Sequence, residues 1–289
     1  MRFVENEGVR LATVSFGTPS NPTVLLIMGA TASMLGWPDE FCAALAAEGL
    51  HVIRFDHRDT GQSTTAPPGS AAYAVEDMAA DVVAVLDAYG AAHAHLVGMS
   101  LGGYIAQMVA LDHPARVGSL SLIASEPLGW DGAPLPGMAP AFLDHFSALA
   151  SLDWSDRAAV TDFLVEIERL CSGRSIGFDS LRTRARVMQV LARTKCPASM
   201  FNHASLTLRC DWTGRFRWIG CPVLVLHGAR DPILPVANGR AIAAGIWGAR
   251  LVVLQDAGHE LPAPAQSTVV HEISATIRAS AGQSPHGLA

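Results

Sequence analysis

Short apolar segments alternate along this 289-residue chain with segments of helical periodicity, and this alternation most constrains its fold. Most of the short segments carry apolar side chains at neighbouring positions, so both faces of each strand are expected to be buried. Such strands, with helices between them, form a parallel sheet covered by helices on both sides. The expected strands are TVLLIM (23–28), HVIRF (51–55), HLVGM (95–99), SLSLIA (119–124), PVLVLH (222–227) and RLVVL (250–254).

The alternation is interrupted after Ser125. Residues 126–140 contain four prolines and three glycines, and a mostly helical pattern follows to about residue 207. We therefore expect a sheet domain made of residues 1–125 and 219–289, and an inserted helical cap subdomain at 126–218. An insertion at this point lies over the carboxyl ends of the strands, where open α/β sheets bind ligands.

Composition and charge exclude several classes of partner. The net charge is −6 and no basic block occurs, so neither a nucleic acid nor an anionic membrane surface is an expected partner. Residues 1–10 have no apolar signal-peptide core, and the aliphatic runs are too short to span a bilayer, which predicts a cytoplasmic protein. We expect it to be a monomer or a homodimer. The five cysteines include no C-x-x-C pair, which predicts reduced thiols and no zinc site. We expect no cofactor either.

A candidate nucleophile lies between an expected strand and an expected helix. Gly98-Met99-Ser100-Leu101-Gly102 matches G-x-S-x-G, with HLV before it and the helical pattern GGYIAQMVALDHP running on from its last glycine. Such a serine occupies a sharp, strained turn, and small residues on either side let strand and helix approach each other. The motif by itself is weak evidence, because a chain with 26 glycines can contain it by coincidence. Its position between an expected strand and an expected helix favours Ser100 as the nucleophile.

A serine hydroxyl needs a general base, and the base needs an acid that orients it. His259 follows the last expected strand in a glycine-flanked loop, and Asp231 follows the strand before it. The order serine, acid, histidine is the one this motif requires, so we predict a triad of Ser100, Asp231 and His259. The competing residues are His57, His113, His227 and His286 for the base and Asp256 for the acid.

The tetrahedral intermediate needs two backbone N–H groups beside the serine. Leu101 N–H lies at the start of the helix after Ser100, and the loop at 28–33 follows the first core strand. We therefore predict an oxyanion hole formed by the N–H groups of Ala30 and Leu101. Because both donors are backbone groups, the side chains at these positions carry little information.

These residues together resemble the α/β-hydrolase superfamily over nearly the whole chain. MGATASMLGWPDEF (28–41) and HVIRFDHRDTGQSTT (51–65) are similar to the aclacinomycin methylesterase group of that superfamily. The resemblance implies an α/β-hydrolase fold, with a mostly parallel sheet, flanking helices and a helical cap inserted after the strand at 119–124. We interpret 51–65 as a structural brace beneath the active site, with Gly61 in a tight turn.

The resemblance implies a serine carboxylic-ester hydrolase that acts on a bulky, hydrophobic, polyketide-like small molecule. The scissile bond is either a methyl ester or the lactone ring of a macrolide, whose opening inactivates an antibiotic. Alternatives are a cofactor-free perhydrolase or haloperoxidase, a C–C bond hydrolase, and a receptor that has lost turnover. Expected substrate-binding residues are Gly29, Trp130, Met138, Phe142 and Phe201.

Overall fold

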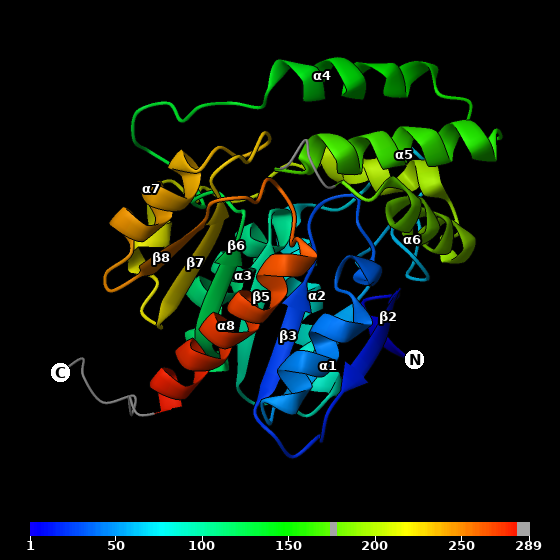
Figure 1. Cartoon of the computed structure of the whole chain (residues 1–289). Helices are drawn as coiled ribbons and strands as arrows, with labels where there is room; N and C mark the ends of the chain where they lie inside the picture. Colours follow the sequence, from blue (N-terminus) through cyan, green and yellow to red (C-terminus); the bar gives the residue numbers. More distant parts are fainter. Residues whose placement is uncertain (174–177, 282–289) are drawn as a thin grey trace.

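The structure is a computed structural model that describes residues 1–173 and 178–281 of the chain. One eight-stranded sheet runs through the molecule in the order β1-β2-β4-β3-β5-β6-β7-β8 (Figure 1). The six expected strands are all present and parallel, and they form β3 to β8, so the predicted fold class is confirmed. The strands are β1 Arg2–Asn6, β2 Val9–Phe16, β3 Thr23–Ile27, β4 His51–Phe55, β5 Ala94–Met99, β6 Val117–Ile123, β7 Val223–Gly228 and β8 Arg250–Leu254.

An antiparallel hairpin, which the sequence analysis did not predict, forms one edge of the sheet. β1 pairs with β2 and β2 pairs antiparallel with β4. The turn between β1 and β2 has positive φ at Glu7 (48°) and Gly8 (83°). Val4 and Leu11 are buried on this hairpin while most of its other side chains are polar or partly exposed. The period-two pattern around Glu7-Gly8 was the signal that could have revealed it.

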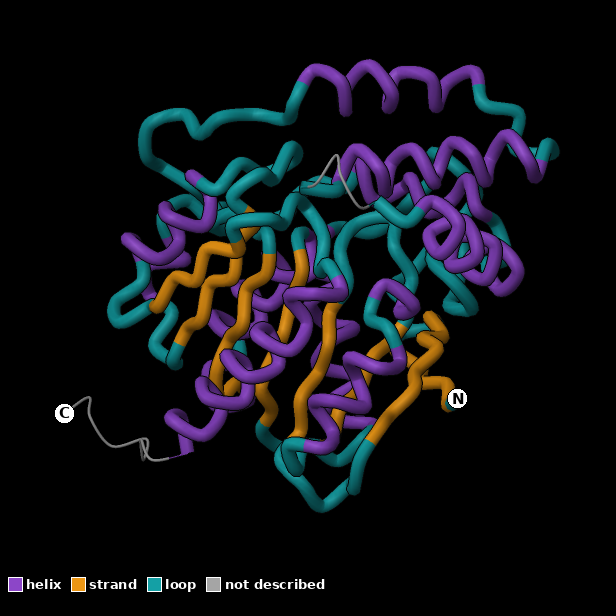
Figure 2. Tube along the Cα trace, in the orientation of Figure 1, coloured by secondary structure: helices purple, strands orange, loops and turns teal. Residues whose placement is uncertain are grey.

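Helices cover both faces of the sheet, which explains the continuous apolar strands. In β3, Leu25 and Ile27 belong to a cluster with α2, α3 and α7, while Val24 and Leu26 belong to a cluster with α1 and α8. Figure 2 shows these helices on either side of the orange strands. The helix expected directly after Ser100 is α3. The helices are α1 Asp39–Ala47, α2 Val75–Ala88, α3 Leu101–Asp112, α7 Ala237–Gly245 and α8 Gln266–Ala281.

The inserted segment lies above the carboxyl ends of the strands, at the top of Figure 1. Its described residues form three α-helices and the nine-residue 3-10 helix η4, and part of the insertion packs on the sheet domain. Leu128, Trp212 and Phe216 are buried in the same cluster as residues of β5 and α3. The insertion elements are α4 Pro140–Ser147, η3 Ala148–Ser151, α5 Arg157–Cys171, α6 Ser180–Arg193, η4 Pro197–Ser205 and η5 Arg215–Trp218; the remaining 3-10 turns are η1 Met34–Gly36, η2 Pro114–Arg116 and η6 Ala263–Ala265.

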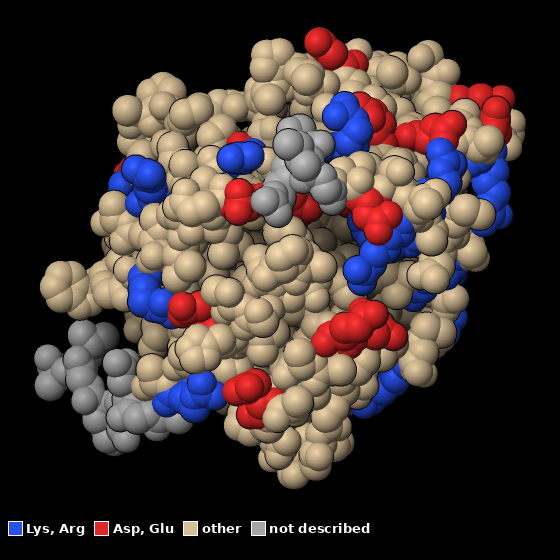
Figure 3. Space-filling view, viewed as in Figure 1, with Lys and Arg blue, Asp and Glu red and all other residues tan. Residues whose placement is uncertain are grey.

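Charged side chains of both signs are interspersed on the face drawn in Figure 3. Within residues 1–173 and 178–281, no helix has the length and apolarity needed to cross a membrane.

Candidate active site

Ser100 occupies a strained turn between β5 and α3. Its backbone angles are φ 52° and ψ −121°, a conformation that is costly for any residue with a Cβ. A Cβ on Gly98 would overlap the carbonyl oxygen of Gly102, and a Cβ on Gly102 would overlap that of Ile27. Both glycines of the motif are therefore required by close backbone approach, as the sequence analysis expected.

Hydrogen bonds attach this turn to the end of β6. The N–H of Ser100 donates to Ile123 O at 2.9 Å, and Ser125 Oγ donates to Ser100 O at 2.9 Å. The next residue, Leu101, is the first of α3, so its N–H points out of the helix N-terminus. The strained serine is thus held next to a backbone donor that has no acceptor within residues 1–173 and 178–281.

His259 and Asp231 form a hydrogen-bonded pair, with Nδ1 of the histidine 2.8 Å from Oδ2 of the aspartate. Oδ1 of Asp231 accepts the N–H groups of Ile233 (2.9 Å) and Leu234 (2.8 Å). Burial alone would raise the pKa of Asp231, but hydrogen bonds from His227, His259 and Leu234 lower it to about 2. The aspartate is therefore ionised and can hold the proton of the imidazole on Nδ1, which leaves Nε2 as a base.

The serine, aspartate and histidine follow β5, β7 and β8, so all three lie at the same edge of the parallel sheet. β6 lies between β5 and β7, and Glu126 follows its end. The charge of His259 lowers the pKa of Glu126, while burial, the larger effect, raises it. The Glu126 residue is nevertheless exposed to solvent, which screens its charge. Sequence reasoning missed this residue, although its place after a central strand was a usable signal.

The loop after β3 lies against the nucleophile. A Cβ on Gly29 would be 3.2 Å from Cβ and 3.8 Å from Oγ of Ser100. In the described part of the chain, the N–H groups of Ala30 and Leu101 donate to no other protein group. Thr31, directly after Ala30, has a positive φ of 62°. This loop therefore lies beside Ser100, and among the described residues its Ala30 N–H has no protein acceptor, as an oxyanion donor would need.

Residues 22–263 match the family described as alpha/beta hydrolase fold. The chain belongs to this family. It is 33% identical to the rhodomycin D methylesterases DnrP of Streptomyces peucetius and DauP of Streptomyces sp. (strain C5), over 96% of this chain and 98% of each relative. Among solved structures, an N-acyl homoserine lactone degrading enzyme shares 29% identity and a TM-score of 0.69, covering 96% of this chain and 99% of that one. The resemblance to the methylesterase group is confirmed, and the chain is a carboxylic ester hydrolase.

The residues that competed for the triad have other surroundings in this hydrolase. Nε2 of His227 lies 2.6 Å from Leu234 O and 3.4 Å from Asp231 Oδ2, so His227 supports the aspartate. His57 is fully buried below the loop after β3. Asp256 is exposed, and it lines a separate surface cavity of about 770 Å³ between α1, α6 and residues 254–266. His113 caps the end of α3, and His286 lies outside the described residues.

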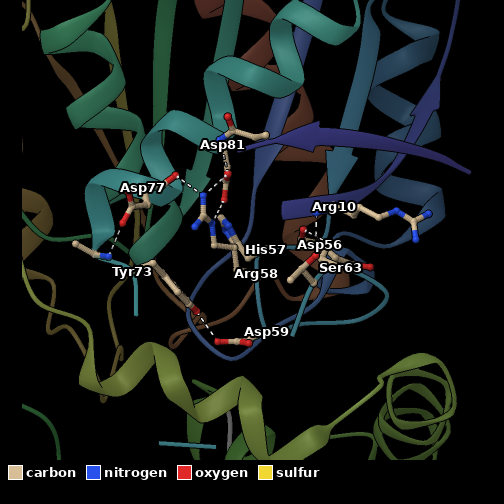
Figure 4. Close-up of polar contacts among 12 residues, drawn as sticks. Arg10, Asp56, His57, Arg58, Asp59, Ser63, Tyr73, Asp77 and Asp81 are labelled. Atoms are coloured by element: carbon tan, nitrogen blue, oxygen red, sulfur yellow. Dashed lines mark hydrogen bonds and ion pairs between the residues drawn. The ribbon is translucent and has the colours of Figure 1, made fainter. Parts of the chain in front are cut away.

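The segment at 51–65 is densely hydrogen-bonded. Asp59 accepts hydrogen bonds from Tyr73 Oη (2.7 Å) and Asn202 Nδ2 (2.8 Å), and Figure 4 shows Tyr73 directed at it. Gly61 has φ 50°, and a Cβ there would overlap the carboxylate of Asp56. These contacts agree with a bracing role and with the expected tight turn at Gly61.

The expected substrate-binding residues of the cap lie in different surroundings. The rings of Phe142 and Phe146 are stacked, with their centroids 5.9 Å apart, and the centroids of Phe146 and Phe201 are 5.7 Å apart. The three rings form a row within the cap. Trp130 lies apart from this row, tilted against Phe216 at 6.0 Å. Met138 is exposed. Substrate contact by these side chains stays a prediction.

Proposed function

We propose that this hydrolase is a serine esterase that removes the methyl group from the methyl ester of a bulky, polyketide-like substrate. The observation that carries the proposal is the 2.8 Å pair of Asp231 and His259 at the same sheet edge as the strained Ser100. The arrangement provides a nucleophile, a base and an ionised acid in the order that serine esterases use.

In this mechanism His259 Nε2 takes the proton of Ser100 Oγ as the oxygen attacks the ester carbonyl. The N–H groups of Ala30 and Leu101 stabilise the tetrahedral oxyanion. His259 then gives its proton to the departing methoxide, so methanol leaves and an acyl-enzyme remains. Water, deprotonated by the same imidazole, attacks the acyl-enzyme; the bond from the acyl carbon to Ser100 Oγ breaks, and the imidazolium returns the proton to Oγ. The carboxylic acid leaves, and Asp231 stays ionised throughout.

Two properties support a polyketide methyl ester as the substrate. The full-length relatives are named as methylesterases of rhodomycin D. The cap supplies a row of aromatic rings, Phe142, Phe146 and Phe201, above the strand ends, and apolar rings of this kind suit a large hydrophobic ligand. We therefore favour methyl-ester cleavage over opening of a macrolide lactone.

Lactone hydrolysis is the second candidate, favoured by the 29% identity to a solved enzyme that degrades N-acyl homoserine lactones. A lactone is an internal ester, so the same residues would open it. The products separate the two reactions by mass. Opening of a macrolide ring, which would inactivate that antibiotic, adds water without loss of a fragment, whereas methyl-ester cleavage releases methanol.

The test combines labelling with turnover. A fluorophosphonate should add one phosphonyl group at Ser100, and Ser100→Ala should abolish both labelling and release of methanol from anthracycline methyl esters. Ser151→Ala, at an exposed cap serine, serves as the control and should behave as the wild type. Unchanged hydrolysis by the Ser100→Ala variant would refute the mechanism. Labelling without turnover of any ester would instead point to a receptor, and peroxide-dependent halogenation or C–C cleavage to the other enzyme classes.

A further inference from the structure

The loop that carries Ala30 is held by a residue of the inserted segment. The N–H of Thr31 donates to Nδ1 of His203 at 3.1 Å, although these residues are 172 positions apart. His203 lies on η4 at 197–205 and is 6% exposed. Because Ala30 directly precedes Thr31, this contact lies one peptide unit from the expected oxyanion donor.

The hydrogen bonds determine the protonation state of His203. A backbone N–H donates to Nδ1, so this nitrogen carries no proton. Nε2 lies 2.8 Å from the carbonyl oxygen of Arg58, so it carries the proton and donates it. The ring is therefore a neutral bridge between the loop after β3 and the loop after β4. Burial lowers the pKa of His203, in agreement with a neutral ring.

Residues of the sheet domain hold the two ends of the same loop. Nε2 of His57 lies 2.9 Å from Met28 O, and Met34 N donates to Asp56 Oδ1 at 2.8 Å. The bond from Thr31 to His203 thus fixes the middle of the loop, where φ is positive and the backbone conformation is costly. Without this acceptor, the peptide units around Ala30 can relax to other angles.

We infer that His203 is a positioning residue, through which the inserted segment sets the direction of the Ala30 N–H in the oxyanion hole. This inference rests on the proposed function, since it assigns His203 to the same acyl-transfer site. Displacement of one donor weakens binding of the transition state more than binding of the ester, so kcat should change while KM stays nearly constant.

Two amide variants separate the acceptor role from the bulk of the ring. The side-chain oxygen of asparagine reaches the place of Nδ1, so His203→Asn keeps an acceptor for Thr31. The longer glutamine reaches the place of Nε2, so His203→Gln keeps the donor to Arg58 and loses the acceptor. His145→Gln is the matched control, because His145 is a cap histidine that contacts Phe163 O.

We expect His203→Gln to lower kcat roughly 10- to 100-fold, short of the roughly 10²- to 10³-fold cost of removing a donor altogether. Affinity for a trifluoromethyl ketone, which forms an oxyanion on the serine, should fall by a similar factor. His203→Asn should recover most of both values, and the His145→Gln variant should match the wild type. Equal kcat values for the Asn and Gln variants would overturn the inference.

A measurement on the wild type does not depend on whether a variant folds. Nitrogen NMR of histidine-labelled protein at pH 7 should show His203 with its proton on Nε2; a proton on Nδ1 would also overturn the inference. Fluorophosphonate labelling separates this failure from that of the proposed function. If Ser100 is labelled but the His203 variants behave alike, the positioning role is wrong; if Ser100 is not labelled, the serine mechanism is wrong.

Discussion

The sheet domain and the inserted cap are stabilised by different interactions. The central strands β3 to β7 are buried on both faces in two large apolar clusters. The cap has only small clusters, such as Val160, Val187 and Leu191, and its helices carry many charged side chains. Leu128, Trp212 and Phe216 pack into the apolar core of the sheet domain, and polar contacts add to this attachment, among them Arg193 to Asp56 and His203 to Thr31.

Further polar attachments join the insertion to loops that follow the strands. Lys195 Nζ donates to Ser63 O at 3.0 Å, and the N–H of His259 donates to Cys171 O, at the end of α5, at 2.8 Å. The inserted segment therefore contacts both the loop with Ala30 and the loop with His259. The comparison indicates that burial builds the sheet, whereas directional bonds from the insertion orient the catalytic loops.

The largest expected effect follows from breaking the acid–base pair of the sheet domain. Asp231→Asn should lower kcat about 10⁴-fold, because a neutral amide no longer holds the imidazole proton on Nδ1 or stabilises the imidazolium. Steady-state kinetics on a methyl ester measure this loss. Asp256→Asn is the control, and loss of activity in that variant instead would assign the acid to Asp256.

The next effect concerns the strongest polar attachment of the cap. Arg193 makes two bonds to the fully buried Asp56, at 2.9 and 2.7 Å. Arg193→Met leaves a buried carboxylate without its cation, so the free energy of unfolding should fall by about 3–5 kcal/mol. Urea denaturation measures the total, and hydrogen exchange should show the largest loss of protection in α6.

A matched control comes from the same helix. Arg184 pairs with Asp162 at the surface, where both side chains are largely exposed. Arg184→Met should therefore cost less than about 1 kcal/mol. The double variant Asp56→Asn/Arg193→Met should be more stable than Arg193→Met alone, since no charge is left unpaired. Equal losses for the two arginine variants would show that the buried pair does not anchor the cap.

A pH-dependent effect is expected from the sheet domain's own support of the Ala30 loop. Burial, with a smaller contribution from His203, lowers the pKa of the fully buried His57 to about 3. An unfolded histidine binds a proton below about pH 6.5, while folded His57 stays neutral until about pH 3. The stability is therefore complete above pH 6.5 and falls as the pH decreases toward 3.

Between pH 7 and pH 4.5 this one group should cost about 2–3 kcal/mol of unfolding free energy. His57→Gln keeps a donor for Met28 O but cannot be protonated, so its loss over this range should be smaller by that amount. Urea denaturation of both proteins at the two pH values tests this. Parallel pH profiles would show that His57 is already solvated or charged in the folded protein.

Most of the fold, and the place of the proposed triad residues after strands of one sheet, could be predicted because each depends on local pattern. β3 to β8 carry the apolar residues that a doubly covered strand needs, and Ser100, Asp231 and His259 each follow such a strand. The β1–β2 hairpin was missed because its strands are short, polar and at the edge. The contacts of Arg193 and His203 could not be predicted, since each joins positions more than 130 residues apart whose proximity depends on how the cap docks.

The smallest effect tests whether the insertion also acts on His259 electrostatically. Glu126 begins the inserted segment, and its carboxylate interacts with His259 without a hydrogen bond of the kind that Asp231 makes. Glu126→Gln should lower kcat only about 2- to 10-fold, because a solvent-screened charge contributes little to the imidazolium in the transition state. The difference from wild type should shrink at high salt, unlike that of Asp231→Asn. Glu166→Gln, at a partly exposed cap glutamate paired with Arg169, should have no effect. If Glu126→Gln lowers kcat as much as Asp231→Asn does, the acid that orients His259 comes from the insertion. The proposal that the sheet domain supplies the whole triad would then be wrong.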